Sequence, residues 1–196
     1  MKKIFLIPGF KQKTNDIMFL HLKTFLKKIN FEVFPVPINW NYKTMTDYVS
    51  EFKEFYNKNK GNDDNYILGF SYGAVIALMT AEDLKPNKIY LCSLSPDFKE
   101  DLIDMKPWIL KYIGKRRCEE IKKRSGIEIA KELNTPAVVF YGEKEAEKFP
   151  DIKKRCEETA RYAKNTKLVI VKNAPHDISH PEYITALKKE LYKITK

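Results

Sequence analysis

The stretch that most constrains the fold is Tyr66–Met79, in which a short turn joins two apolar runs. The first run, Tyr66–Leu68, has the length of a strand and follows a cluster of Asn, Asp and Gly at 61–65. The second run, Ala74–Ala81, is rich in Ala and apolar residues and favours a buried helix. Between them lies Gly69–Gly73, with the sequence Gly-Phe-Ser-Tyr-Gly. The pattern therefore predicts a strand that enters a helix through a Gly-x-Ser-x-Gly turn.

A Gly-x-Ser-x-Gly turn between a strand and a helix is the pattern of a nucleophile elbow. Side chains two positions either side of the serine would collide with the neighbouring strand and helix, so both positions are glycine. The sharp turn lifts the Ser71 hydroxyl clear of the sheet and points the helix N-terminus at the reacting atom. Ser71 is therefore the candidate nucleophile; the alternative is a tight glycine turn around an inert serine.

The rest of the chain alternates between strand-like and helical patterns. Strands are expected at 4–7, 31–36, 66–68, 88–94, 137–141 and 168–171. Thr44–Asp47 and Ser179–Glu182 have the capping-box pattern that opens a helix, whereas 97–133 is the least regular stretch. Alternation of this kind implies parallel strands joined by helical crossovers, with reactive groups at the carboxyl ends of the strands. We predict one domain, 1–196, with the α/β class of fold: a three-layer α/β/α sandwich around a six-stranded parallel sheet.

The composition bears on partners and location. The formal net charge is +10, but the lysines are spread along every predicted helix and arginine is scarce, which favours a solvated surface over a nucleic-acid interface. No apolar run reaches 18 residues, so no membrane insertion is expected. The apolar run Ile4–Ile7 is too short for a signal peptide and is interpreted as the first strand. We expect a cytoplasmic protein, and the sequence leaves its oligomeric state open.

Four motifs resemble those of the α/β-hydrolase family, and the resemblance covers nearly the whole chain. They follow the first, third, fifth and sixth predicted strands: Ile7–Phe10, Gly69–Gly73, Tyr141–Glu145 and Asn173–Asp177. The resemblance implies the strand order 2-1-3-4-5-6, with the elbow strand central and the family's two antiparallel leading strands missing. It also implies a catalytic triad in the family's chain order of nucleophile, acid and histidine.

The residues that match this triad are Ser71, Glu145 and His176. A serine hydroxyl attacks well only when a base takes its proton, and His176 would be that base and later the acid for the leaving group. Glu145 would hold the imidazole tautomer and stabilise the imidazolium. Family members usually have Asp at this place, and the extra methylene of Glu implies a slightly retracted loop. Asp97, after the fourth strand, is the alternative acid.

The resemblance also implies an oxyanion hole made by two backbone N–H groups, those of Phe10 and Tyr72. Pro8-Gly9 stands where the family often has His-Gly before the first donor. No His-Gly-Gly-Gly motif is present, so the lipase-like version of the hole is not supported.

The segment 97–133 lies where family members often carry a cap over the active site. It combines apolar residues, Trp108 and Leu110 among them, with a basic run at 115–124. We expect a small cap that forms an apolar pocket with a cationic rim, in which Trp108 and Leu110 contact substrate. Such a pocket would favour small or medium acyl groups.

The function implied by the resemblance is hydrolysis of carboxylic esters through an acyl-enzyme, with a small-molecule ester or thioester as substrate. An acyl-thioesterase or acyltransferase would use the same triad. A third possibility is a non-catalytic binding protein whose basic run, 115–124, holds an acidic partner. His176, Asp177 and His180 have loose metal-ligand spacing, but a zinc site needs three or four converging ligands. No metal or cofactor is therefore expected.

Overall fold

The computed structural model describes residues 2–62, 64–103 and 105–194. Its six strands form one sheet in the order β2-β1-β3-β4-β5-β6, and every neighbouring pair is parallel. They are β1 (Lys2–Ile7), β2 (Phe31–Pro35), β3 (Asn65–Phe70), β4 (Lys88–Cys92), β5 (Ala137–Gly142) and β6 (Thr166–Val171). The predicted order and direction of the strands are confirmed, and β3, the elbow strand, lies inside the sheet.

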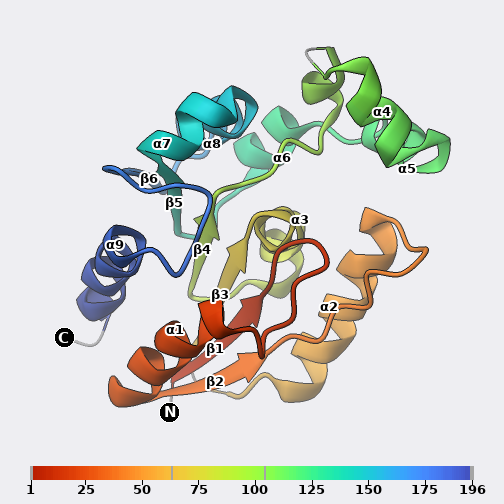
Figure 1. Cartoon of the computed structure of the whole chain (residues 1–196). Helices are drawn as coiled ribbons and strands as arrows, with labels where there is room; N and C mark the ends of the chain where they lie inside the picture. The colour runs from red at the N-terminus through yellow and green to blue at the C-terminus, as the bar shows by residue number, and fades with distance from the viewer. Residues whose placement is uncertain (1, 63, 104, 195–196) are drawn as a thin grey trace.

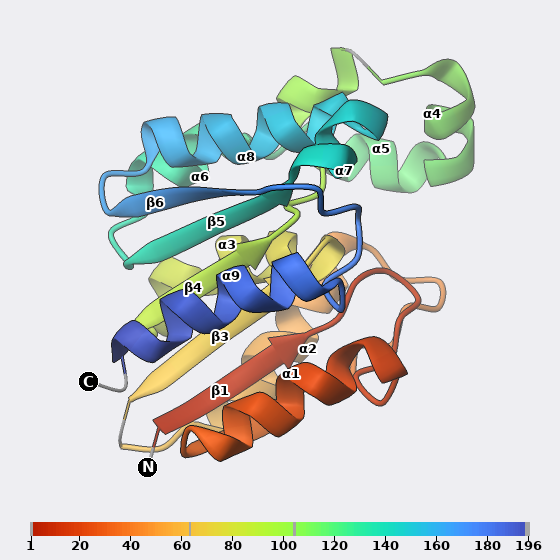
Figure 2. The ribbon, with the colours of Figure 1, turned by 60° about the vertical axis from the view of Figure 1, so that its left-hand side comes forward.

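Helices cover both faces of this sheet (Figures 1 and 2). Residues of α2, α3, α6 and α8 build the apolar core on one face, and residues of α1 and α9 build the core on the other. Their bounds are α1 (Ile17–Lys28), α2 (Met45–Asn59), α3 (Tyr72–Leu84), α6 (Gly126–Glu132), α8 (Pro150–Tyr162) and α9 (Pro181–Leu191). The predicted three-layer α/β/α sandwich is confirmed.

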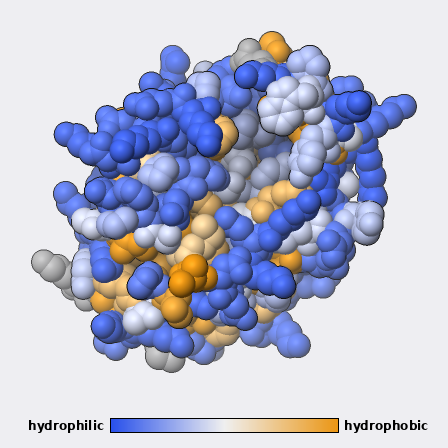
Figure 3. Space-filling view, in the orientation of Figure 1, coloured by the Kyte–Doolittle hydropathy of each residue, from blue (hydrophilic) through white to orange (hydrophobic). Residues whose placement is uncertain are grey.

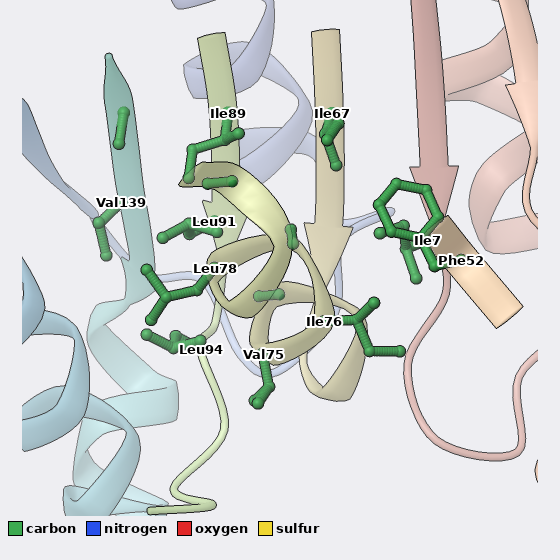
Figure 4. Packing of buried hydrophobic residues seen from close by; sticks show 14 of the residues in the cluster. Ile7, Phe52, Ile67, Val75, Ile76, Leu78, Ile89, Leu91, Leu94 and Val139 are labelled. Carbon is green, nitrogen blue, oxygen red and sulfur yellow. The ribbon is translucent and has the colours of Figure 1, made fainter. Parts of the chain in front are cut away.

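The helix that follows the elbow, α3, lies at the centre of one core. Its side chains are apolar nearly all round, and Gly73–Leu78 is buried without interruption. A helix of this composition is stable only when other elements surround it. Figure 4 shows Val75, Ile76 and Leu78 of α3 among side chains from the sheet, including Ile7 and Ile67. The helix that follows the elbow is therefore anchored in the apolar core on one face of the sheet.

The two predicted capping boxes have different outcomes. At the start of α2 the Thr44 N–H donates to Asp47 Oδ2 over 2.8 Å, so the first capping box is confirmed. The second prediction is wrong, because α9 has His180 as its N-cap without a side-chain cap. The Ser179 hydroxyl donates to Asp177 Oδ1 over 2.6 Å instead. The Ser179 side chain therefore bonds within a short turn around Asp177 and does not cap α9.

The irregular segment 97–133 contains short helices. They are η1 (Lys99–Ile103), α4 (Pro107–Ile113), α5 (Lys115–Ile121) and α6. In both ribbon views α4 and α5 stand out from the body beside the carboxyl ends of the strands (Figures 1 and 2). Of the helices in the described part of the chain, none has the length and apolar character needed to cross a membrane.

Candidate active site

Ser71 lies on the sharp turn between β3 and α3, with φ 55° and ψ −116°. A Cβ at Gly69 would lie 2.2 Å from the carbonyl oxygen of Gly73, and one at Gly73 would lie 2.3 Å from that of Ile7. Neither position can carry a side chain, because real Cβ atoms do not approach backbone oxygens so closely. The Ser71 N–H donates to the Cys92 carbonyl over 2.8 Å, which ties the turn to β4. The strained serine turn predicted from the sequence is present.

Glu145 and His176 meet although 31 positions separate them. Glu145 lies on α7 (Glu143–Lys148), a short helix directly after β5, where a loop had been expected. Its side chain is 1% exposed, and its Oε1 accepts a hydrogen bond from His176 Nδ1. Its Oε2 accepts from the Gly142 N–H over 2.8 Å and from the Ser93 hydroxyl over 2.9 Å. Three donors therefore fix this buried carboxylate.

The His176 imidazole lies beside the elbow. Its ring is 4.9 Å from the ring of Phe70, the residue before Ser71, and 6.0 Å from that of Phe149. With Nδ1 on Glu145, Nε2 is left as the nitrogen that can exchange a proton with substrate groups. Contacts of this kind hold the ring in one orientation, as a general base requires.

The Ser71 hydroxyl forms its hydrogen bond with Ser95, at an Oγ–Oγ distance of 3.0 Å. Between Ser71 and His176 the described residues show no hydrogen bond. Hydrogen bonds of catalytic groups are often loose without substrate and tighten only when it binds. Ser95 follows β4 and is 6% exposed, so the Ser71 hydroxyl is bonded to a buried side chain. Sequence reasoning had not assigned it this contact.

Asp97, the alternative acid, lies against other partners. The Tyr72 hydroxyl donates to its Oδ1 over 3.1 Å, and the Arg124 guanidinium pairs with its Oδ2. Arg124 Nε also donates to the Asp97 carbonyl over 2.8 Å. Burial raises the pKa of Asp97 to about 6, although Arg124 and Tyr72 act in the opposite direction. The structure thus brings Glu145, not Asp97, to His176.

The two backbone groups expected to form an oxyanion hole lie close to Ser71. Tyr72 opens α3, and a Cβ at Gly9 would lie 3.2 Å from the Cβ of Ser71. The ring of Phe10, the next residue, is 5.4 Å from the ring of Tyr72. Within the described ranges neither the Phe10 N–H nor the Tyr72 N–H has a hydrogen-bond partner. Both N–H groups are therefore unbonded in this part of the described chain.

The two residues expected at a substrate pocket are less closely tied to this site. Trp108 and Leu110 lie on α4; Trp108 is 66% exposed, and Leu110 is half-buried. No hydrogen bond or ring contact of the described residues joins either one to Ser71 or His176. The face seen in Figure 1 is nonetheless hollowed near its centre, and most of the surface around the hollow is hydrophilic (Figure 3).

Two residues behind the acid were missed by sequence reasoning. Ser93 follows β4 with a φ of 54° and donates to Glu145, and the Tyr183 hydroxyl on α9 lies 2.9 Å from Ser93 Oγ. The carboxyl-end rule for parallel sheets could have indicated Ser93. Tyr183 is completely buried and resembles any other core residue in the sequence. In the described ranges no three His, Cys, Asp or Glu side chains converge as metal ligands would.

Comparisons with known proteins support the fold. No protein-family model and no curated protein matched the sequence. Among solved structures, Est1E from Butyrivibrio proteoclasticus is similar with a TM-score of 0.81 and 14% identity, over 100% of this chain and 89% of that one. An esterase from Exiguobacterium antarcticum has a TM-score of 0.74 and 13% identity, over 100% and 92% of the two chains. Alpha/beta hydrolase domain-containing protein 10 from mouse has a TM-score of 0.72 and 15% identity, over 98% of this chain and 88% of that one.

Proposed function

We propose that this chain, which has the fold of the α/β hydrolases, is a serine hydrolase that cleaves carboxylic esters. The observation that carries the proposal is the buried Glu145 carboxylate on Nδ1 of His176, next to the strained turn that bears Ser71. A structural role alone does not require an acid, an imidazole and a half-buried serine on a strained turn at the same end of a parallel sheet. The ester-hydrolysing neighbours share this fold at low identity, so the activity is argued from these residues.

In the proposed reaction the Ser71 oxygen attacks the ester carbonyl while His176 Nε2 takes its proton. The carbonyl electrons move to oxygen, and the resulting anion accepts hydrogen bonds from the Phe10 and Tyr72 N–H groups. Collapse of this intermediate breaks the bond to the alcohol, which receives the proton from His176. Water then attacks the acyl-enzyme with His176 as base, and Ser71 is released with the acid product.

Glu145 would act through His176. Its negative charge favours the imidazolium that forms in each step, and its fixed position keeps the proton of the neutral ring on Nδ1. The segment 97–133 would be the cap, and the substrate a small-molecule ester. The same groups would also cleave a thioester or transfer the acyl group to another alcohol, because the acyl-enzyme is common to all three reactions.

The test is labelling with a fluorophosphonate, which reacts with activated serines. We expect the wild-type chain to be labelled and Ser71→Ala to be unlabelled, with a melting temperature changed by only a few degrees. Ser50→Ala is the matched control, since its hydroxyl donates to the Thr46 carbonyl on the exposed side of α2. Labelling that persists in Ser71→Ala would move the nucleophile elsewhere, with Ser95 the first candidate.

The histidine has a control of its own in the same loop. His176→Ala should lose hydrolysis of p-nitrophenyl esters, whereas His180→Ala should keep most of it, because His180 pairs with Glu182 at the start of α9. The same assay with acyl-thioesters and with alcohol acceptors separates esterase from thioesterase and acyltransferase. A chain that binds these esters without turnover would instead support a binding protein.

A further inference from the structure

A cavity of about 350 Å³ opens next to Phe10. Its lining residues come from the loop after β1, the segment that leads into α2, and helices α4 and α5. Figure 1 shows how these elements are arranged. Four aromatic side chains, two cations and one amide line it: Phe10, Trp40, Tyr42, Tyr112, Lys11, Arg117 and Asn41. Tyr42 is 98% exposed and Tyr112 66% exposed, so the site is open to solvent. Its volume is within the range of small-molecule sites.

Phe10 is the residue that this cavity shares with the proposed reaction centre. The backbone of Phe10 would donate to the oxyanion, and its ring contacts Tyr72 on one side and Trp40, at 5.6 Å, on the other. The Trp40 indole N–H donates to the Gln12 carbonyl over 3.1 Å, which fixes the loop after β1 against this wall. A group held in the cavity would therefore be one part of an ester whose carbonyl reaches Ser71.

The two cations lack acidic partners. The Lys11 ammonium is 5.3 Å and the Arg117 guanidinium 5.2 Å from the centre of the Phe10 ring. No carboxylate of the described residues pairs with either, whereas the adjacent Lys43 and Arg116 are paired with Glu51 and Asp47. The cavity wall is thus left with positive charge that the protein does not compensate.

Arg117 is also held in place. Its Nε and Nη2 donate to the Lys43 carbonyl over 3.2 Å and 3.0 Å, and Nη2 lies 3.2 Å from the Tyr48 hydroxyl. These bonds use one edge of the guanidinium and leave Nη1 without a partner among the described residues. A cation that is already ordered loses little conformational entropy when it binds an anion.

Aromatic walls and uncompensated cations suit one kind of ligand group. A flat ring packs against aromatic side chains, and a carboxylate on that ring can accept charge-assisted hydrogen bonds from Lys11 and Arg117. We propose that this cavity binds an aromatic carboxylate that forms part of the ester, and that the chain therefore prefers anionic aromatic esters. The inference rests on the proposed function for its reaction, but the binding step does not.

Two pairs of esters test the preference and distinguish the two halves of the substrate. 4-Nitrophenyl 4-carboxybenzoate against 4-nitrophenyl benzoate places the charge on the acyl side, and 4-acetoxybenzoate against phenyl acetate places it on the alcohol side. After correction for hydroxide-catalysed rates, we expect kcat/KM to favour the anionic member of at least one pair by about threefold to tenfold. The preference should shrink as salt is added.

The cations are tested by matched variants of one loop. Lys11→Met should lower the anionic-to-neutral ratio of kcat/KM toward one. Lys13→Met removes the same charge two residues away, outside the cavity lining, and should leave the ratio unchanged. Arg117→Met should lower the ratio as Lys11→Met does. If Arg117→Met does not fold, Lys11→Met by itself still tests the proposal.

Binding of terephthalate and of neutral benzamide, followed by saturation-transfer NMR, provides a measurement that needs no turnover. We expect terephthalate to bind the wild type and Lys13→Met, and to bind Lys11→Met more weakly. Binding without hydrolysis of any ester would count against the proposed function and support the cavity. Hydrolysis without an anionic preference, or equal binding in both lysine variants, would overturn the inference about the cavity.

Discussion

At the scale of single residues, two buried carboxylates, those of Glu145 and Asp97, are candidates for the acid that pairs with His176. Glu145 Oε1 bonds to His176, whereas Asp97 is occupied by Tyr72 and Arg124. We expect Glu145→Gln to lower kcat by about 10²–10⁴, because the imidazole loses its charge partner and its fixed tautomer. Asp97→Asn should keep kcat within about tenfold of wild type, since Asp97 has no bond to the histidine. Steady-state kinetics on p-nitrophenyl esters checks both; a crippled Asp97→Asn beside a near-normal Glu145→Gln would reverse the assignment.

The raised pKa of Asp97 should make the stability of the fold depend on pH. Burial raises its pKa from 3.8 to about 6, so between these values the folded chain holds a proton that the unfolded chain has released. The group therefore favours folding at low pH, and its contribution is lost as the pH rises toward 6. Between pH 4 and pH 7, the free energy of unfolding of the wild type, measured in urea, should fall by about 1–3 kcal/mol relative to that of Asp97→Asn. A difference that does not change with pH would contradict the burial argument.

At the scale of elements, the position of the short helix α7 determines how long the side chain at position 145 must be to reach His176. Glu145 is the third residue of α7, and its carboxylate accepts the Gly142 N–H while it also bonds to His176. The extra methylene of Glu is thus accommodated by a helical turn, not by a retracted loop. Because the Glu145 N–H also donates to the Ala174 carbonyl over 3.1 Å, the backbone at this position is held, and we expect a shorter side chain to lose one of the two bonds.

Glu145→Asp should therefore be impaired although it keeps the charge and restores the residue usual in the family. We expect kcat to fall by about 10–10², the cost of an acid misplaced by roughly 1 Å. Circular dichroism is the control for folding, and Glu147→Asp, on the same helix but exposed, is the matched variant. Activity of Glu145→Asp equal to wild type would mean that α7 adjusts freely.

At the scale of the whole molecule, a buried ion pair joins the segment 97–133 to the body. Arg155 on α8 is completely buried, and its Nη2 lies 2.6 Å from Oδ1 of Asp101 on η1. Its guanidinium also lies 5.1 Å from the centre of the Phe98 ring. This contact fixes the first part of the segment against the helix that covers β5 and β6.

Removing one partner should leave the other charge buried alone. We expect Arg155→Met to lower the free energy of unfolding by about 3–5 kcal/mol, because Asp101 then has no cation. The double variant Arg155→Met/Asp101→Asn should recover part of this loss. Guanidinium unfolding measures both, and Lys153→Met, on the exposed side of α8, is the control. A double variant less stable than Arg155→Met alone would contradict the ion-pair account.

The sequence by itself determined the layer architecture, the strand order through its family resemblance, and the place of Ser71. Apolar periodicity, helix-start residues and the spacing of Gly69 and Gly73 act within a few residues of the chain, so they can be interpreted without coordinates. The same holds for the order in which Ser71, Glu145 and His176 follow their strands.

Only the tertiary structure decided which groups meet. The bond of His176 to Glu145, the contact of Ser95 with Ser71, and the contact of Arg117 with the Phe10 ring join residues far apart in the chain. Side-chain reach and packing at the carboxyl end of the sheet settle such pairings, and neither leaves a local sequence pattern. For the same reason the sequence indicated a basic run, and the fold placed its Arg117 at a cavity beside the candidate oxyanion hole.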